Sequence, residues 1–171
     1  MIHLNIGSNL DSKHGSRFDN ITIAINLLRD SKIEVKKISS LYETPSYPNR
    51  NFPKFLNVGL VVHYKNDYLN LLRIIKLIEK KIGRIKSKKN DPRIIDIDII
   101  DFKNEVKKTK ELILPHPKCH LRNFVLFPIL QIDPNWSHPI LKKNALYLIN
   151  SLNQKFRIEI TRLKKNVNIQ L

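Results

Sequence analysis

The chain has 171 residues, a mass of 20.1 kDa, 42% hydrophobic and 27% charged residues, and a formal net charge of +16. This balance is typical of a folded globular protein, and no apolar run approaches the ~18 residues of a membrane helix. A single cysteine, Cys119, excludes an internal disulfide framework and a zinc site built from several thiolates. The four glycines form none of the common glycine-rich nucleotide cradles.

The first part of the chain predicts alternating strands and helices. Residues 2–6 are an apolar strand, and residues 16–30 show helical periodicity, with Ser16 placed to cap the first turn. Residues 33–42 are rich in β-branched residues and predict a second strand. Residues 46–54 contain two prolines and predict a loop.

The middle of the chain completes a recognisable unit. Residues 55–64 predict a strand, residues 68–82 an amphipathic helix that stops at Gly83, and residues 94–102 a further strand. The order β-α-β-β-α-β matches the ferredoxin-like unit, an α+β fold in which both helices cover one face of an antiparallel sheet.

The remaining residues form a C-terminal extension. Residues 121–132 and 143–153 are apolar segments that predict helices, and we expect the extension to pack on the other face of the sheet. Because no repeat or linker interrupts the pattern, we expect residues 1–171 to form a single domain. The first residues lack a basic and then apolar leader, so we expect a cytoplasmic protein.

Two carboxylates stand out in the strand at 94–102. Side chains alternate across a strand, so Asp96 and Asp98 share one face, with Cα atoms roughly 6.6 Å apart, while the isoleucines between them face the core. Neighbouring carboxylates repel, and a metal such as Mg²⁺ would compensate them. The alternative is a solvated acidic face on an edge strand. Asp101 falls on the isoleucine face in this register and is not counted as a ligand.

Cations precede the acidic pair. The loop at 84–93 carries Arg84, Lys86, Lys88, Lys89 and Arg93, a layout suited to a metal-bound polyphosphate, although such a run is more often a solvated loop. A basic surface also attracts nucleic acid. However, lysine, isoleucine and asparagine are all abundant, so a bias toward A/T-rich codons explains most of the charge.

A histidine-rich segment follows. His116 lies between two prolines in a stiff stretch, which suits a directed hydrogen bond. His116, Cys119 and His120 are potential ligands of a soft metal, but three donors so close in sequence with no fourth argue against such a site.

These motifs resemble one family. GSNL at 7–10, YETP at 42–45, DPRIIDIDII at 91–100 and LPHPKCHLRNFVLFP at 114–128 resemble 6-hydroxymethyl-7,8-dihydropterin pyrophosphokinases, enzymes of folate synthesis. The resemblance covers about residues 1–135. It implies a ferredoxin-like α+β fold and transfer of diphosphate from ATP to the pterin hydroxymethyl group, with release of AMP and use of two Mg²⁺.

The resemblance also implies roles for individual residues. Asp96 and Asp98 would bind both metal ions, and Arg84 and Arg93 would bind phosphates and take part in catalysis. The remaining implied ATP-binding residues are Glu79, Lys86, Lys89, Ile99, His116 and Arg122. The implied pterin-binding residues are Thr44, Pro45, Phe55, Asn57 and Phe124. Two phenylalanines suit the faces of a flat heterocycle, and an asparagine amide suits its polar edge.

The loop before the acidic pair departs from the family pattern. Lys89-Asn90-Asp91 stands where the family often has a tryptophan and a glycine, and we expect slower turnover with the same substrates. We expect ATP and the pterin as partners, a monomer, and neither a nucleic-acid partner nor a membrane partner. The rival interpretations are a small basic nucleic-acid-binding domain and a Mg²⁺-dependent nuclease.

Overall fold

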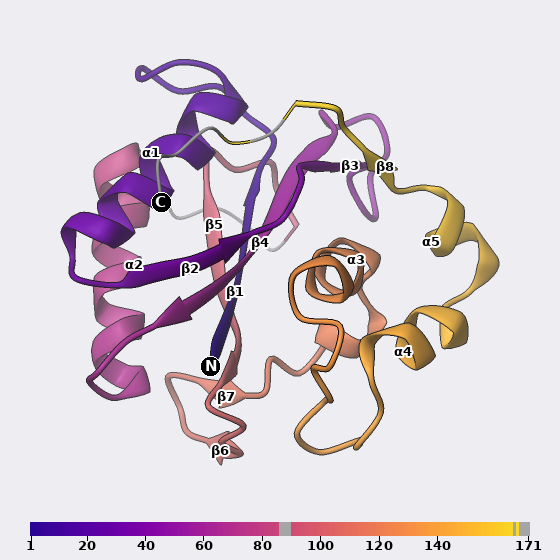
Figure 1. The fold of residues 1–171 in the computed structure, drawn as a ribbon. Coiled ribbons are helices and arrows are strands. Elements are labelled where there is room, and N and C mark those ends of the chain that lie inside the picture. Colours follow the sequence, from indigo (N-terminus) through magenta and orange to yellow (C-terminus); the bar gives the residue numbers. More distant parts are fainter. Residues whose placement is uncertain (86–89, 166, 168–171) are drawn as a thin grey trace.

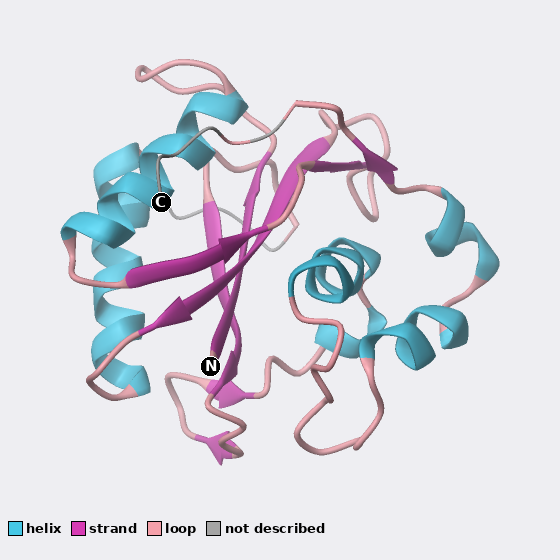
Figure 2. Ribbon diagram, in the orientation of Figure 1, coloured by secondary structure: helices cyan, strands magenta, loops and turns pink. Residues whose placement is uncertain are grey.

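The computed structural model describes residues 1–85, 90–165 and 167 (Figures 1 and 2). The strands are β1 (Ile2–Ser8), β2 (Glu34–Ile38), β3 (Tyr42–Thr44), β4 (Phe55–His63), β5 (Asp96–Phe102), β6 (Lys107–Lys108), β7 (Ile113–Leu114) and β8 (Thr161–Arg162). The helices are α1 (Arg17–Asp30), α2 (Tyr68–Ile82), the 3-10 turn η1 (Cys119–Leu121), α3 (Asn123–Ile132), α4 (Ala145–Ser151) and α5 (Gln154–Ile158).

Within the described residues, six strands form one antiparallel sheet. The order is β5-β1-β4-β3-β8, and β2 also pairs with β4. β1 lies between β5 and β4, so Ile6 pairs with both Ile97 and Val58. In chain order the unit is βαββαβ, with β2 and β3 sharing one strand position beside β4. This topology confirms the predicted ferredoxin-like α+β fold.

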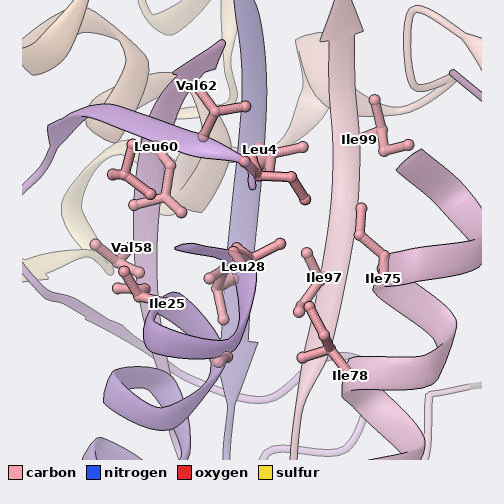
Figure 3. Close-up of a cluster of buried hydrophobic side chains, with 14 of the residues drawn as sticks. Leu4, Ile25, Leu28, Val58, Leu60, Val62, Ile75, Ile78, Ile97 and Ile99 are labelled. Atoms are coloured by element: carbon pink, nitrogen blue, oxygen red, sulfur yellow. The ribbon is translucent and has the colours of Figure 1, made fainter. Parts of the chain in front are cut away.

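Apolar side chains fill both faces of the sheet. Figure 3 shows Ile97 and Ile99 of β5 facing Ile75 and Ile78 of α2. Burial of each such side chain contributes about 1.5–3 kcal/mol to stability. A second cluster, around Trp136, joins α3 and α4 on the opposite face, and Figure 1 shows the sheet between the two layers of helices. The expectation that the C-terminal extension covers the second face is therefore confirmed.

A glycine allows α3 to approach the sheet closely. A Cβ atom at Gly59 in β4 would lie 2.6 Å from the Cβ of Pro128 in α3, well inside van der Waals contact. Only a residue without a side chain fits between the two backbones. The close contact fixes α3, whose first turn borders the cleft described below.

The segment at 33–42 is not one strand, as the sequence predicted, but two. Ser39 interrupts it: its N–H donates to the Gly59 carbonyl (2.9 Å), and its hydroxyl accepts the Gly59 N–H (2.9 Å). A side chain thus replaces a backbone acceptor in the ladder, and the regular pairing breaks between β2 and β3.

A bulge in β5 overturns the predicted orientation of Asp101. The register between β1 and β5 shifts after Ile99, so that His3 pairs with Asp101 and Ile100 is the extra residue. Side chains beyond the bulge change face. Asp101 therefore leaves the face of Ile97 and Ile99 and lies on the face of the second cluster, where Ile100 also packs. A carboxylate oxygen of Asp101 there accepts the indole N–H of Trp136 at 2.9 Å.

The end of the chain returns to the sheet edge. The helix predicted at 143–153 is shorter, and the sequence did not predict α5 or β8. β8 pairs with β3, placing Thr161 opposite Glu43 and Arg162 opposite Tyr42. Elements this short carry no periodic signal. Within the described part of the chain, no helix is long and apolar enough to cross a membrane.

A buried polar network lies beside the bulge. His3 Nε2 is 2.8 Å from a carboxylate oxygen of Asp133, and His3 Nδ1 is 3.8 Å from Asp101. Burial lowers the pKa of His3 from its ordinary value of 6.5, although both carboxylates oppose the shift. Burial and the neighbouring His120 also lower the pKa of His138.

The network predicts that the protein loses stability in mild acid. His3 and His138 bind protons less readily when folded than when unfolded, so their contribution is complete above about pH 6.5 and is lost as the pH falls below it. Urea denaturation at pH 7.5 and 5.5 measures the loss. His138→Asn should reduce the difference in unfolding free energy between the two pH values, whereas replacement of the exposed His63 should not. A midpoint that does not fall at pH 5.5 would contradict this assignment.

Candidate active site

A cavity of about 430 Å³ opens on the α3 side of the sheet. Residues of β1, β3, β4 and β5 line it together with the loop after β3, the start of α3 and the region of α5. The side chains divide into a charged group and an apolar and amide group. The charged group contains Asp96, Asp98, Arg93 and Arg122, and the second group contains Thr44, Pro45, Phe55, Asn57 and Phe124.

Both aspartates of β5 face the cavity, as the alternation along the strand predicts. Asp96 pairs with Gly7 of β1 and Asp98 pairs with Asn5, and all four residues line the cavity. About a quarter of each aspartate side chain is exposed. The two carboxylates therefore stand side by side at a cleft.

Arginines compensate the two carboxylates. Arg84 donates to one oxygen of Asp96 at 2.6 Å, and Arg93 donates to the other at 2.7 Å. Arg122 donates to Asp98 at 3.2 Å. The three arginines come from separate segments, so the acidic pair organises the charged half of the cleft.

The environment of Asp98 fits a cation. Burial raises the pKa of Asp98 to about 6, and the negative charge of Asp96 adds to the increase, while Arg122 opposes it. Two adjacent carboxylates on one strand form a hard oxygen donor set of the kind that Mg²⁺ prefers. The residues present therefore suit the metal that the family implies.

Glu79 acts from beneath the cleft and does not line it. Its carboxylate is almost fully buried and accepts the backbone N–H of Ile97 at 2.8 Å. It also binds Arg84 and, at 2.9 Å, Lys76. Glu79 therefore ties α2 to β5 and holds Arg84 in position beside Asp96.

His116 is held with a proton directed at the charged group. Its Nδ1 accepts the backbone N–H of Lys118 at 3.1 Å, and burial lowers its pKa to about 4. The neutral ring therefore carries its proton on Nε2. Nε2 lies 3.3 Å from the Arg122 guanidinium and 3.9 Å from Asp98. The N–H groups of His116 and Arg122 thus lie close together, and such a pair of donors suits an anion.

The five residues predicted for the pterin line the second half of the cavity. Asn57 and Thr44 are buried, and the Asn57 amide donates to the Thr44 hydroxyl at 3.1 Å. The guanidinium of Arg122 lies 5.4 Å from the centre of the Phe124 ring, so the charged and apolar halves of the cavity meet there.

Besides Glu79, three described residues predicted for ATP do not line the cavity: Arg84, His116 and Ile99. Arg84 borders the charged group through Asp96, and His116 borders it through Arg122. The side chain of Ile99 is buried in the core against α2, on the opposite face of β5 from the aspartates. Lys86 and Lys89 lie outside the described residues.

Sequence reasoning missed several lining residues. Asn5 alternates with apolar neighbours in β1, a detectable signal, and its buried side-chain oxygen has no hydrogen-bond partner in the described structure. Arg50, Phe156 and Glu159 also line the cavity. They come from a loop and from the C-terminal extension, where no pattern marks them.

The fold does not bring together the three potential soft-metal ligands considered from the sequence, His116, Cys119 and His120. Cys119 and His120 lie with His138, not His116, and potential ligand atoms of these three residues lie within 4.8 Å of one another. His138 Nδ1 accepts two backbone N–H groups at 3.2 Å, so the neutral ring carries its proton on Nε2. Burial raises the pKa of the Cys119 thiol to about 12. Both residues are thus protonated, and we assign no metal to them.

The ferredoxin-like fold carries a cleft whose charged half suits a polyphosphate and whose apolar half suits a flat heterocycle. The model of the family described as 7,8-dihydro-6-hydroxymethylpterin-pyrophosphokinase matches residues 3–134. The chain belongs to this family, which makes it a transferase, a pyrophosphokinase of folate synthesis.

Named relatives agree with the family match. A 2-amino-4-hydroxy-6-hydroxymethyldihydropteridine pyrophosphokinase of Aquifex aeolicus is 41% identical over 83% of this chain and 86% of its own length. One of Bacillus subtilis is 33% identical over 76% of each protein. A crystal structure of Plasmodium falciparum HPPK-DHPS shares the fold, with a TM-score of 0.68 at 18% identity over 94% of this chain. The present chain spans 47% of that longer protein.

The role of Glu79 can be tested by stability. Glu79→Gln should lower the free energy of unfolding by about 2–4 kcal/mol, because the buried ion pair with Arg84 is broken. Glu105→Gln is the matched control, since its pair with Lys107 is exposed and should change stability by less than about 1 kcal/mol. Equal urea midpoints for the two variants would contradict the anchoring role.

Proposed function

We propose that this cleft binds ATP and 6-hydroxymethyl-7,8-dihydropterin side by side and transfers the terminal diphosphate of ATP to the pterin hydroxymethyl group. The observation that carries the proposal is the junction of two halves in one cavity. One half presents paired carboxylates and arginines, and the other presents two phenylalanines and a buried amide. Polyphosphate and heterocycle require these two environments.

We propose that Asp96 and Asp98 hold two Mg²⁺ ions. Bound there, Mg²⁺ would supply positive charge that neutralises the phosphates. The two carboxylates supply the protein ligands from a rigid strand, which fixes where the phosphates lie.

The proposed phosphate-binding side chains are those of Arg84, Arg93, Arg122, His116, Lys86 and Lys89. In the structure Arg84 shares its guanidinium between Glu79 and Asp96. Glu79 keeps it oriented, and the N–H group that now pairs with Asp96 turns to a phosphate oxygen. The Nε2 proton of His116 supplies a neutral donor beside Arg122. Ile99 can meet the nucleotide through its backbone alone.

For the pterin, Phe55 and Phe124 are proposed to pack on the ring faces, and Asn57 and Thr44 to hydrogen-bond its polar edge beside Pro45. The hydroxymethyl oxygen then attacks the β-phosphorus in line, and its proton is released to solvent. A new oxygen–phosphorus bond forms, the bond from the β-phosphorus to the bridging α–β oxygen breaks, and AMP leaves. Positioning and charge stabilisation supply the catalysis. We further propose that the enzyme acts as a monomer in the cytoplasm, which supplies ATP.

Asp98→Ala should abolish AMP formation from MgATP and the hydroxymethyl dihydropterin, because the phosphates lose a metal ligand. Pterin binding, followed by pterin fluorescence, should survive. Asp30→Ala removes an exposed carboxylate at the end of α1 and should retain full activity. Full activity in Asp98→Ala would contradict the metal assignment, and Mg²⁺-dependent cleavage of nucleic acid without AMP formation would favour a nuclease.

Arg84→Ala should lower kcat by about 10²–10³-fold, because a donor that stabilises developing phosphate charge is lost. The KM for the pterin should change much less. Arg84→Lys keeps the charge but not the fork and should recover part of the loss. Steady-state kinetics with each substrate varied in turn provide the measurement. A defect confined to pterin binding would overturn the phosphate role.

A further inference from the structure

The C-terminal extension reaches the wall of the cavity. Phe156 and Glu159 line it, although both residues lie beyond the part of the chain that the family model matches. They stand beside residues 45–50, the same loop that contributes Pro45 to the apolar half of the cavity. The extension therefore contributes side chains to the end of the cleft assigned to the pterin.

Two side-chain contacts join the extension to this loop. The ring of Phe156 meets the ring of Tyr47 edge to face, with centroids 5.9 Å apart. The carboxylate of Glu159 binds the guanidinium of Arg50 at 2.5 Å. An ion pair at the surface contributes little to stability, but this one bridges two segments that border one cavity. Its effect is to set the position of the loop.

Further contacts hold both the loop and the C-terminal extension in place. The loop stem is held by Asn9, whose amide donates to Ser46 (3.2 Å) and to the carbonyl of Pro53 (3.0 Å). The extension is held by β8 on β3 and by the Asn123 amide, which donates to the carbonyl of Phe156 at 2.6 Å. Asn123 immediately precedes Phe124, so one short segment supports two aromatic residues of the cavity wall.

We propose that Phe156 contributes to pterin binding and that the Arg50–Glu159 pair positions the pterin-binding loop against it. This inference rests on the proposed function. The aromatic face of Phe156 covers the outer end of a flat bicyclic ligand, and the ion pair holds the loop closed over that end. Since neither contact reaches Asp96, Asp98 or the arginines beside them, the pterin site is affected and the ATP site is not.

Steady-state kinetics test the proposal on the full chain. Phe156→Ala should raise the KM for the pterin by at least fivefold, with less than a twofold change in the KM for ATP, and Phe156→Trp should restore most of the affinity. Ile158→Ala is the matched control, because Ile158 lies on the same short helix with 73% of its surface exposed. It should leave both KM values unchanged.

Charge reversal tests the ion pair. Arg50→Glu and Glu159→Arg should each raise the KM for the pterin, and the double variant should return it to within twofold of the original. Equal rises in both KM values, or no rescue in the double variant, would overturn the proposal. AMP formation by the unmodified protein distinguishes failure of the proposed function from failure of this inference. If the unmodified protein forms no AMP, the proposed function fails. If it forms AMP and Phe156→Ala leaves the KM for the pterin unchanged, only this inference is refuted.

Discussion

The alternation of side chains along β5 is the constraint on which the rest of the molecule depends. Ile97 and Ile99 turn toward α2 and bury their side chains, and this fixes Asp96 and Asp98 on the other face. Two adjacent carboxylates need positive partners, which Arg84, Arg93 and Arg122 supply. The core and the charged half of the cleft are therefore two faces of one strand.

The second face of the sheet determines what the cleft can hold. Gly59 lets α3 approach β4 closely, and the helix then presents Phe124 at the cavity. Trp136 and its neighbours hold this layer in place. The apolar half of the cleft thus depends on packing contributed by residues that follow the βαββαβ unit, which on its own leaves that face of the sheet open.

Part of the site could be read from the sequence, because local pattern determines it. The apolar spacing of residues in α2 and the capping Ser16 of α1 predicted where these two helices lie in the chain. The structure contains the capping box at Ser16. The acidic pair followed from period-two alternation. The alternation pattern did not predict the break in strand pairing at Ser39 or the bulge at Ile100. Strand register depends on both paired strands, so one strand's sequence does not determine it.

The sequence by itself determined the long helices and strands of the βαββαβ unit, the acidic pair and, through family motifs, the class of reaction, because these depend on residues close together in the chain. Only the tertiary structure showed that Glu79 is a buried anchor, that Asp101 turns away from the isoleucines, and that Phe156 borders the cavity. Each of these depends on contacts between segments distant in the chain. Such contacts are decided by how whole layers pack, and no local pattern encodes them.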